Sequence, residues 1–253
     1  MHANLLQLSK KIRVGAVSYL NTKPLLYGLQ HHAVSESIEL IEDYPANLAR
    51  ALQDNTIDIG LVPVAVIPSL AEPHIISDYC IGATGPVASV CIFSKVPMEQ
   101  IKSLYLDYQS KTSVNLAKML LKYYWKKEVQ FLEAPNNFMD LIDGNTAAVI
   151  IGDRALDKFD SYPFRYDLAE AWIGYTGKPF VFATWVSNKQ LDAGFITSFN
   201  EANALGLANI DTVIEQLSTD INSYDLHTYF TKNISYTLDA AKKEGMAQFL
   251  SLL

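Results

Sequence analysis

Three short polar segments follow strand-like apolar runs and contain the residues best suited to hold a small ligand. They are Ser18 to Thr22, Ser110 to Ser113, and Gly152 to Arg154. In parallel α/β sheets, ligands collect beyond the carboxyl ends of the strands, where helix N-termini offer free N–H groups and a partial positive charge. The segments therefore predict a cleft for a small anionic ligand. Its candidate substrate-binding residues are Ser18, Thr22, Ser110, Thr112, Ser113 and Gly152.

Asn21 is the most informative residue of the first segment, because its amide can both donate and accept a hydrogen bond. Thr22, Thr112 and Ser113 could equally serve only as N-caps of the helices that follow, and Asp153 could do the same. The sequence has no nucleophile elbow, phosphate loop or dinucleotide fingerprint. Its His residues show no metal-ligand spacing, so we expect no metal.

The two halves of the chain repeat one another at a fixed offset, which bears on how these segments are positioned. Pro45 superposes on Pro135 at an offset of 90 residues. The same offset aligns Asn47 with Asn137, Leu48 with Phe138, Leu52 with Ile142, Asn55 with Asn145, and Thr56 with Thr146. The repeat indicates a duplicated βαβαβ unit, with coincidence in a chain that is 49% hydrophobic as the alternative. Duplication would place the segments at Thr22 and Thr112 at equivalent positions facing one cleft.

Strand-like and helix-like segments alternate along most of the chain, which predicts parallel sheets. Strands are expected over residues 12–17, 38–42, 57–62, 74–81, 86–93, 104–107, 129–132, 147–151 and 179–187. Helices are expected over residues 21–30, 45–54, 64–70, 112–126 and 136–143. From about Lys189 the periodicity is helical, and this tail is expected to pack against the first lobe.

We therefore predict an α/β fold of two lobes, each a mostly parallel sheet with flanking helices, with a cleft between them. Residues 1–93 together with 188–253 would form the first lobe, and residues 94–187 the second. The chain would cross between the lobes near Phe93–Ser94 and near Thr184–Val186.

Composition and charge narrow the class of protein. The 253 residues carry a net charge of −7, which argues against a nucleic-acid partner, because phosphate backbones are bound mainly by clustered Lys and Arg. No stretch approaches the roughly 20 apolar residues that span a bilayer, and no signal peptide is evident, so we expect a cytoplasmic protein without a membrane partner. Cys80 and Cys91 lie in apolar runs and are expected to be buried free thiols, with a cross-strand disulfide as the alternative.

The run VGAVSYLNTKPLLYGL from Val14 resembles the opening signature of the MqnA family, the chorismate dehydratases of the futalosine pathway of menaquinone biosynthesis. The likeness continues in DIGLVPVA from Asp58, GPVASVCIFSK from Gly85 and AAVIIGDRAL from Ala147, and it covers nearly the whole chain. The resemblance implies a two-lobed fold of the type II periplasmic-binding-protein kind. It also implies a hydro-lyase that converts chorismate to 3-[(1-carboxyvinyl)oxy]benzoate and water without a cofactor.

The resemblance also assigns site residues. The motif asparagine of the family maps on Asn21 and the serine of its SV pair maps on Ser89. Its SRTS segment maps on Ser110 to Ser113, with Lys111 in place of the arginine, and lysine lacks the guanidinium fork that binds a carboxylate bidentately.

The general base is left open among Asp153, Asp107 and the substrate's own enolpyruvyl carboxylate, with the last as our hypothesis. The predicted catalytic residues are accordingly Asn21, Ser89 and Asp153.

Two other functions fit the same fold, because a fold does not fix a function. A non-catalytic solute-binding protein for a small aromatic or carboxylic acid is the main alternative, although such a receptor would be exported. A ligand-sensing lobe of a regulator is the other, and the sequence offers it no basic DNA-binding module.

Overall fold

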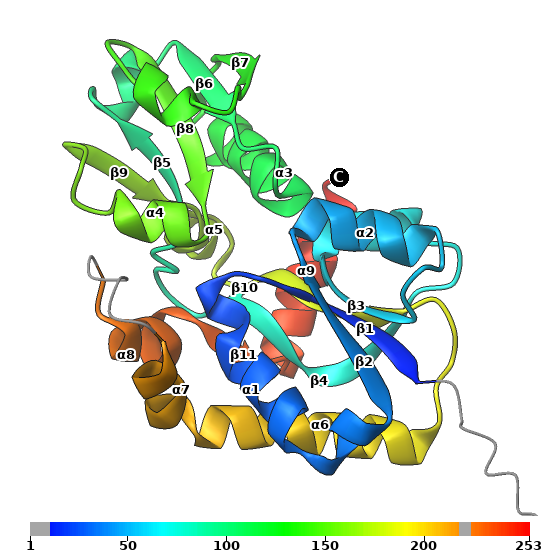
Figure 1. Cartoon of the computed structure of the whole chain (residues 1–253). Helices are drawn as coiled ribbons and strands as arrows, with labels where there is room; N and C mark the ends of the chain where they lie inside the picture. The colour runs from blue at the N-terminus through cyan, green and yellow to red at the C-terminus, as the bar shows by residue number, and fades with distance from the viewer. Residues whose placement is uncertain (1–10, 218–223) are drawn as a thin grey trace, which may run out of the picture.

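A computed structural model describes residues 11–217 and 224–253, and within these ranges the strands form two β-sheets (Figure 1). The strands of the first sheet are β1 (Ile12–Val17), β2 (Ile38–Asp43), β3 (Ile59–Pro63), β4 (His74–Ala83), β10 (Phe180–Ser187) and β11 (Ser235–Thr237). Those of the second sheet are β5 (Val90–Ser94), β6 (Ser103–Leu106), β7 (Gln130–Glu133), β8 (Thr146–Ile151) and β9 (Phe164–Asp167). The predicted α/β fold with two sheets and flanking helices is confirmed, but each sheet combines parallel and antiparallel strands and is mixed, not mostly parallel.

Helices flank both sheets. The α-helices are α1 (Lys23–His31), α2 (Pro45–Gln53), α3 (Lys111–Met119), α4 (Asp153–Asp157), α5 (Leu168–Thr176), α6 (Ala193–Ala208), α7 (Ile210–Gln216), α8 (Leu226–Thr228) and α9 (Ala240–Ser251). Short 3₁₀-helices are η1 (Leu20–Thr22), η2 (Ala33–Glu36), η3 (Val64–Ser69), η4 (Met98–Gln100) and η6 (Phe138–Leu141). Two π-helical turns are η5 (Leu120–Tyr124) and η7 (Tyr229–Asn233).

The two sheets share one strand order. The first runs β11-β4-β10-β3-β1-β2 and the second β9-β5-β8-β6-β7. In each sheet three strands are parallel, β2-β1-β3 and β7-β6-β8, and an antiparallel strand follows, β10 beside β3 and β5 beside β8. The repeat read from the sequence therefore corresponds to a repeated topology.

The antiparallel strand of each sheet comes from the other half of the chain, which shifts the lobe boundaries from those expected. β5 pairs with β8 and β9, whereas residues 90–93 were assigned to the first lobe. β10 pairs with β3 and β4, whereas residues 180–187 were assigned to the second lobe. The crossings consequently lie at residues 84–89 and 177–179, not at Phe93–Ser94 and Thr184–Val186. All eight residues of β10 are buried, and such a strand carries no alternation that would indicate its neighbours.

The C-terminal tail packs on the first lobe, as predicted. α6 lies along α1 at the base of the lobe in Figure 1. The two helices approach so closely that a Cβ added at Gly28 would lie 1.8 Å from the Ala202 carbonyl oxygen, and one at Gly206 would lie 1.8 Å from that of Pro24. Only glycine permits this backbone approach. β11 then adds an edge strand beside β4.

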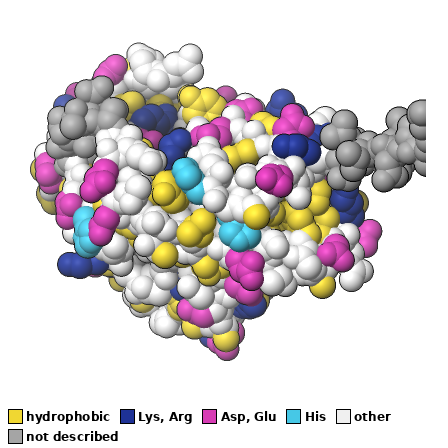
Figure 2. Space-filling view, turned by 60° about the horizontal axis from the view of Figure 1, so that its bottom comes forward, with side chains coloured by type: hydrophobic (Ala, Val, Ile, Leu, Met, Phe, Trp, Pro, Cys, Tyr) yellow, Lys and Arg dark blue, Asp and Glu magenta, His cyan; other side chains and the backbone are white. Residues whose placement is uncertain are grey.

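Both cysteines are buried free thiols, so the favoured prediction is confirmed and the disulfide alternative is not. Burial raises the pKa of the Cys80 thiol to about 12. Within the described ranges, none of the helices is long and apolar enough to cross a membrane. On the face turned forward in Figure 2, Lys and Arg side chains are interspersed with Asp and Glu and do not form one basic surface.

Candidate active site

A cavity lies where strands of both sheets end. Val17, Pro63 and Ile151 are the last residues of β1, β3 and β8, and all three reach the wall of the cavity. The remaining lining residues are Tyr19, Asn21, Pro45, Ile81, Val87, Ser89, Val90, Ser110, Ser113, Gly152, Phe182 and Ala183. This position beyond the carboxyl ends of parallel strands is the one that the sequence predicts for the ligand.

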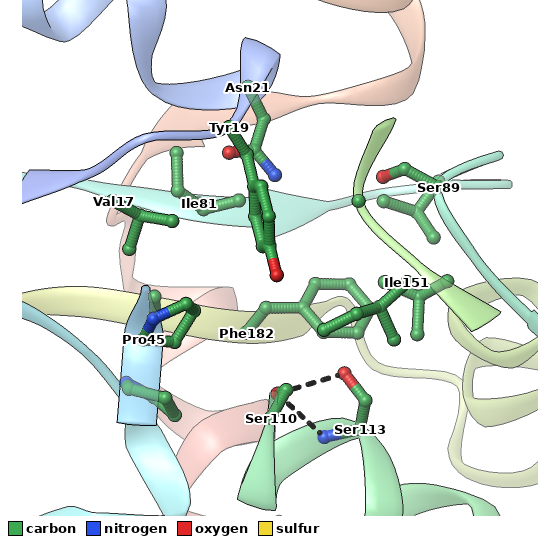
Figure 3. Close-up of a pocket in the computed structure, with 15 residues that line it drawn as sticks. Val17, Tyr19, Asn21, Pro45, Ile81, Ser89, Ser110, Ser113, Ile151 and Phe182 are labelled. Carbon is green, nitrogen blue, oxygen red and sulfur yellow. Dashed lines mark hydrogen bonds between the residues drawn. The ribbon is translucent and has the colours of Figure 1, made fainter. Parts of the chain in front are cut away.

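The wall of the cavity is mainly apolar, with a few polar groups at its two ends. Asn21 and Ser89 lie at one end and Ser110 and Ser113 at the other, with the ring of Phe182 between them (Figure 3). Of the described residues that line it, none is Lys, Arg, His, Asp or Glu. Such a surface suits a flat, largely apolar ligand whose oxygen atoms are met by neutral donors.

Ser89 is presented to the cavity by a strained turn in the crossing that precedes β5. Ser89 N–H donates to the Val87 carbonyl at 2.8 Å, and the intervening Ala88 has φ of +63°. A three-residue turn with positive φ at a non-glycine residue costs about 1–3 kcal/mol and persists only where neighbours enforce it. Here the Ala88 N–H donates to Asp167 Oδ2 at 2.7 Å, and the Ser89 carbonyl accepts from Gly152 N–H at 2.8 Å.

The Asp167 carboxylate binds both the start of α5 and the turn that precedes Ser89. Its Oδ1 accepts from the Ala169 and Glu170 N–H groups at 3.0 and 3.1 Å, which caps α5, while its Oδ2 accepts from Ala88. Burial raises the pKa of this carboxyl, and the backbone N–H groups that bind it offset part of the rise. The start of α5 and the turn at Ser89 are therefore fixed by one side chain.

Asn21 lies in η1, directly after β1. Its Oδ1 accepts from the Thr22 hydroxyl at 3.1 Å, and its carbonyl accepts from the Tyr236 hydroxyl at 2.9 Å. These bonds leave the amide nitrogen facing the cavity, and in Figure 3 it points toward the side of the cavity where Ser89 lies. Asn21 and Ser89, which the resemblance singled out, are thus brought together.

The helix start at Thr22 does not offer the free N–H groups that the sequence predicts. Thr22 N–H donates to the Tyr19 carbonyl at 3.0 Å, and Lys23 N–H donates to the Leu20 carbonyl, because η1 precedes α1. Leu20 N–H donates to Asp153 Oδ1 at 3.0 Å. The anion at this helix start is therefore a carboxylate of the protein itself. Thr22 makes no capping bond with its side chain and does not line the cavity.

Asp153 and Thr112 link the two lobes and do not line the cavity. Burial raises the pKa of Asp153 to about 6, and the Leu20 N–H opposes this rise. Thr112 Oγ1 accepts from the Ala65 N–H at 3.1 Å. The interpretation of Asp153 and Thr112 as helix caps is wrong, since both side chains bind backbone of the opposite lobe.

Ser110, not Thr112 or Ser113, caps α3. Its hydroxyl accepts from Ser113 N–H at 3.3 Å and from the Ser113 hydroxyl at 3.1 Å. Both serines line the cavity, as does Gly152, so these three predicted binding residues lie at the site. Ser18 does not line it; its N–H donates to the Asp43 carbonyl at 3.2 Å.

A chain of polar contacts crosses the cleft beside the cavity. Arg154 Nη2 donates to Asp107 Oδ2 and to Gln109 Oε1, both at 2.6 Å, and the Tyr19 hydroxyl of the other lobe also donates to Gln109 Oε1. The Asp107 side chain is fully buried, and burial raises the pKa of this carboxyl while Arg154 opposes the rise. With the bonds to Asp153 and Thr112, these contacts close the two lobes on one another.

Sequence reasoning missed the aromatic side chains of the site. Tyr19 could have been found, because it stands beside Asn21 in the recognised motif. The sequence did not indicate that Phe182 lies at the site, because Phe182 reaches the cavity only as part of β10, which pairs with strands of the first sheet. The described residues contain no group of three or more His, Cys, Asp or Glu side chains that could hold a metal ion.

The two-lobed fold with a cleft at the strand ends is that of periplasmic binding proteins. The periplasmic aliphatic sulphonate-binding protein of Escherichia coli superposes with a TM-score of 0.59 at 14% identity, covering 96% of this chain and 86% of that one. A protein from Archaeoglobus fulgidus superposes with a TM-score of 0.69 at 14% identity, covering 96% and 97% of the two chains.

Sequence similarity places the chain within one family of this fold. Residues 12–253 match the family described as menaquinone biosynthesis, so the chain belongs to the menaquinone biosynthesis family. The chorismate dehydratase of Thermus thermophilus is 24% identical over 268 residues, covering 95% of this chain and 94% of that protein.

Proposed function

We propose that this protein is a chorismate dehydratase, a hydro-lyase that converts chorismate to 3-[(1-carboxyvinyl)oxy]benzoate and water. The observation that carries the proposal is the pairing of Asn21 with Ser89 at one end of an apolar cavity, in a chain similar to a chorismate dehydratase over 95% of its length. The apolar wall suits the carbon ring of the substrate, and the polar groups at its two ends can meet the substrate oxygens.

The elimination balances without a further reactant. A base removes the proton from the ring carbon that bears the ether, and the electron pair of that C–H bond forms the new ring double bond. The C–O bond of the neighbouring carbon breaks, and its oxygen leaves with the bonding electrons and takes up a proton to become water. The ring becomes aromatic, so the protein has to supply orientation, donors for the departing oxygen and exclusion of water.

The two protein carboxylates considered as bases are both occupied by other partners. Asp153 accepts from Leu20 N–H, and Asp107 is paired with Arg154. Neither lines the cavity. This supports our hypothesis that the enolpyruvyl carboxylate of the substrate removes the ring proton, with the Asn21 amide fixing the reacting geometry.

Substrate carboxylates would be held by neutral donors. The N-terminus of α3 faces the cavity through Ser110 and Ser113, and a helix start stabilises a negative charge. No cationic side chain is among the described lining residues, so the affinity for a dianion would come from hydroxyl and amide groups and from the α3 dipole.

The test is turnover of chorismate by purified protein without added metal or nucleotide, followed by liquid chromatography and mass spectrometry of the product. We expect the carboxyvinyloxy-benzoate, with no inhibition by a chelator. Chorismate that binds, as measured by calorimetry, but is recovered unchanged would instead support the non-catalytic solute-binding function.

A further inference from the structure

Two buried hydroxyl groups, one of which lines the cavity, have no hydrogen-bond partner. Among the described residues, the buried side-chain atoms in this condition are Ser89 Oγ, Trp172 Nε1, Asn188 Oδ1 and Tyr229 Oη. Buried polar groups are nearly always paired, so each exception needs an explanation. Tyr229 and Ser89 come from distant parts of the chain, yet both Ser89 and Asn21 influence the ionisation of Tyr229.

Tyr229 belongs to the C-terminal tail, which is hydrogen-bonded both to the segment that contains Asn21 and to the one that leads to Ser89. Asn233 Nδ2 donates to the Pro86 carbonyl at 2.9 Å, next to the turn that presents Ser89. Tyr236 donates to the Asn21 carbonyl at 2.9 Å. The Tyr229 ring itself is fully buried. The position of its hydroxyl is therefore set by the same contacts that position Asn21 and Ser89.

The Tyr229 hydroxyl keeps its proton in this setting and can donate a hydrogen bond. Burial raises its pKa well above the usual range, and the nearby Asp153 raises it further, while Ser89 and Asn21 offset part of the rise. A tyrosine that stays protonated can donate one hydrogen bond, and a serine hydroxyl has one proton and two acceptor lone pairs. If Tyr229 donates to Ser89 Oγ, the Ser89 proton must point away from Tyr229. Because Ser89 lines the cavity, this proton can then point into the cavity.

We propose that Tyr229 is a positioning residue that acts through Ser89. When the substrate is bound, the Tyr229 hydroxyl donates to Ser89 Oγ, so that the Ser89 proton is directed at the oxygen leaving the substrate. Hydrogen bonds in such a chain strengthen one another, and the apolar wall increases their effect. The inference rests on the proposed function, because it takes the departing oxygen of chorismate as the group that Ser89 meets.

The first test is Tyr229→Phe, which removes only the hydroxyl. We expect kcat for chorismate to fall about tenfold, the effect of one hydrogen bond, with KM changed much less. The Tm should stay equal or rise, because the hydroxyl that is removed has no partner in the free protein. A merely structural role would lower the Tm and leave kcat unchanged.

The second test is a double-mutant cycle with Ser89→Ala. If Tyr229 acts through Ser89, the variant carrying both changes should be no slower than Ser89→Ala alone. Tyr162→Phe is the matched control, because this tyrosine of the second lobe donates to the Met139 carbonyl at 3.0 Å, has its hydroxyl satisfied and does not line the cavity. It should lower the Tm and leave kcat unchanged.

The outcomes separate this inference from the proposed function. Suppose that the wild type converts chorismate. The inference alone is then overturned if Tyr229→Phe leaves kcat unchanged, or if the losses of kcat from Tyr229→Phe and Ser89→Ala add in the double-mutant cycle. If the wild type binds chorismate without turnover, the proposed function fails and the same cycle is measured on chorismate affinity, where independent effects overturn the inference. A wild type that neither converts nor binds chorismate overturns both.

Discussion

The two lobes share a strand order but offer the cavity different chemistry. In the first lobe, η1 lies between β1 and α1, uses the N–H groups at the helix start, and turns the amide of Asn21 toward the cavity. In the second lobe, α3 starts at a serine cap, and Ser110 and Ser113 face the cavity from a helix N-terminus. Because of η1, the helix start of the first lobe has no free N–H groups for a ligand, whereas that of the second lobe faces the cavity.

The segments that cross between the lobes also contribute different residues to the cavity. Ser89 comes from the crossing that leads into β5, and Phe182 from β10, which the second crossing delivers to the first sheet. We therefore assign the reacting end of the cavity to Asn21 and Ser89, and the binding end to Ser110 and Ser113.

The largest expected effect tests this division directly. Asn21→Ala should lower kcat for chorismate by about 10²–10³, the range seen when one positioned donor is removed, with a smaller loss of affinity. Ser113→Ala, at the other end, should raise KM with kcat nearly preserved. Steady-state kinetics and calorimetry on both variants give the comparison, and the reverse assignment of kcat and affinity losses would contradict it.

A smaller loss of kcat is expected when the turn that presents Ser89 is weakened. Asp167→Ala should lower kcat by about 10–10², because the turn at Ala88 loses the acceptor that fixes it and the Ser89 hydroxyl is displaced. Asp192→Ala is the control, since Asp192 caps α6 by accepting from Phe195 N–H at 3.0 Å and lies in no such turn. Both variants should lose stability, Asp167→Ala more because its carboxylate accepts from three backbone N–H groups and that of Asp192 from one, but only Asp167→Ala should lose kcat. Equal kcat values in the two variants would show that Asp167 acts only as a cap.

The burial of Asp153 between the lobes predicts a dependence of stability on pH. The pKa of Asp153 is about 6 in the folded protein against an ordinary value of 3.8, so the folded state binds the proton more tightly. The contribution of this group to the free energy of unfolding is therefore greatest below pH 3.8 and falls by about 2 kcal/mol as the pH rises to 6.

Asp153→Asn isolates this contribution, because the amide oxygen can still accept from Leu20 N–H. Urea denaturation at several pH values should show a shallower decline in the variant than in the wild type between pH 4 and 6. Parallel curves would show that another group carries the dependence.

The smallest effect is expected at the other contact between the lobes. Thr112→Val removes the acceptor of Ala65 N–H and should cost about 1 kcal/mol of stability. It should also favour opening of the lobes, which small-angle scattering would detect as a larger radius of gyration in the absence of ligand. An unchanged radius would indicate that the contacts of Tyr19 and Asp153 suffice to keep the lobes closed.

The sequence by itself determined the local structure and the repeat. Strand β1 begins and ends at the predicted residues, Pro24 lies in the first turn of α1, and the offset of 90 residues relates strands that occupy equivalent places in the two sheets. These features depend on periodicity, on proline geometry and on matching residues, all of which are visible within short windows of the chain.

Only the tertiary structure decided what those local elements contact. The partners of β5 and β10, the bond between Asp153 and Leu20, and the bond from Tyr236 to Asn21 all join residues far apart in the sequence. A fully buried strand has the same apolar sequence in either sheet, and an aspartate at a helix start can bind its own helix or another. Which of these occurs depends on the packing of the two lobes, because only the closed cleft brings the competing partners within reach.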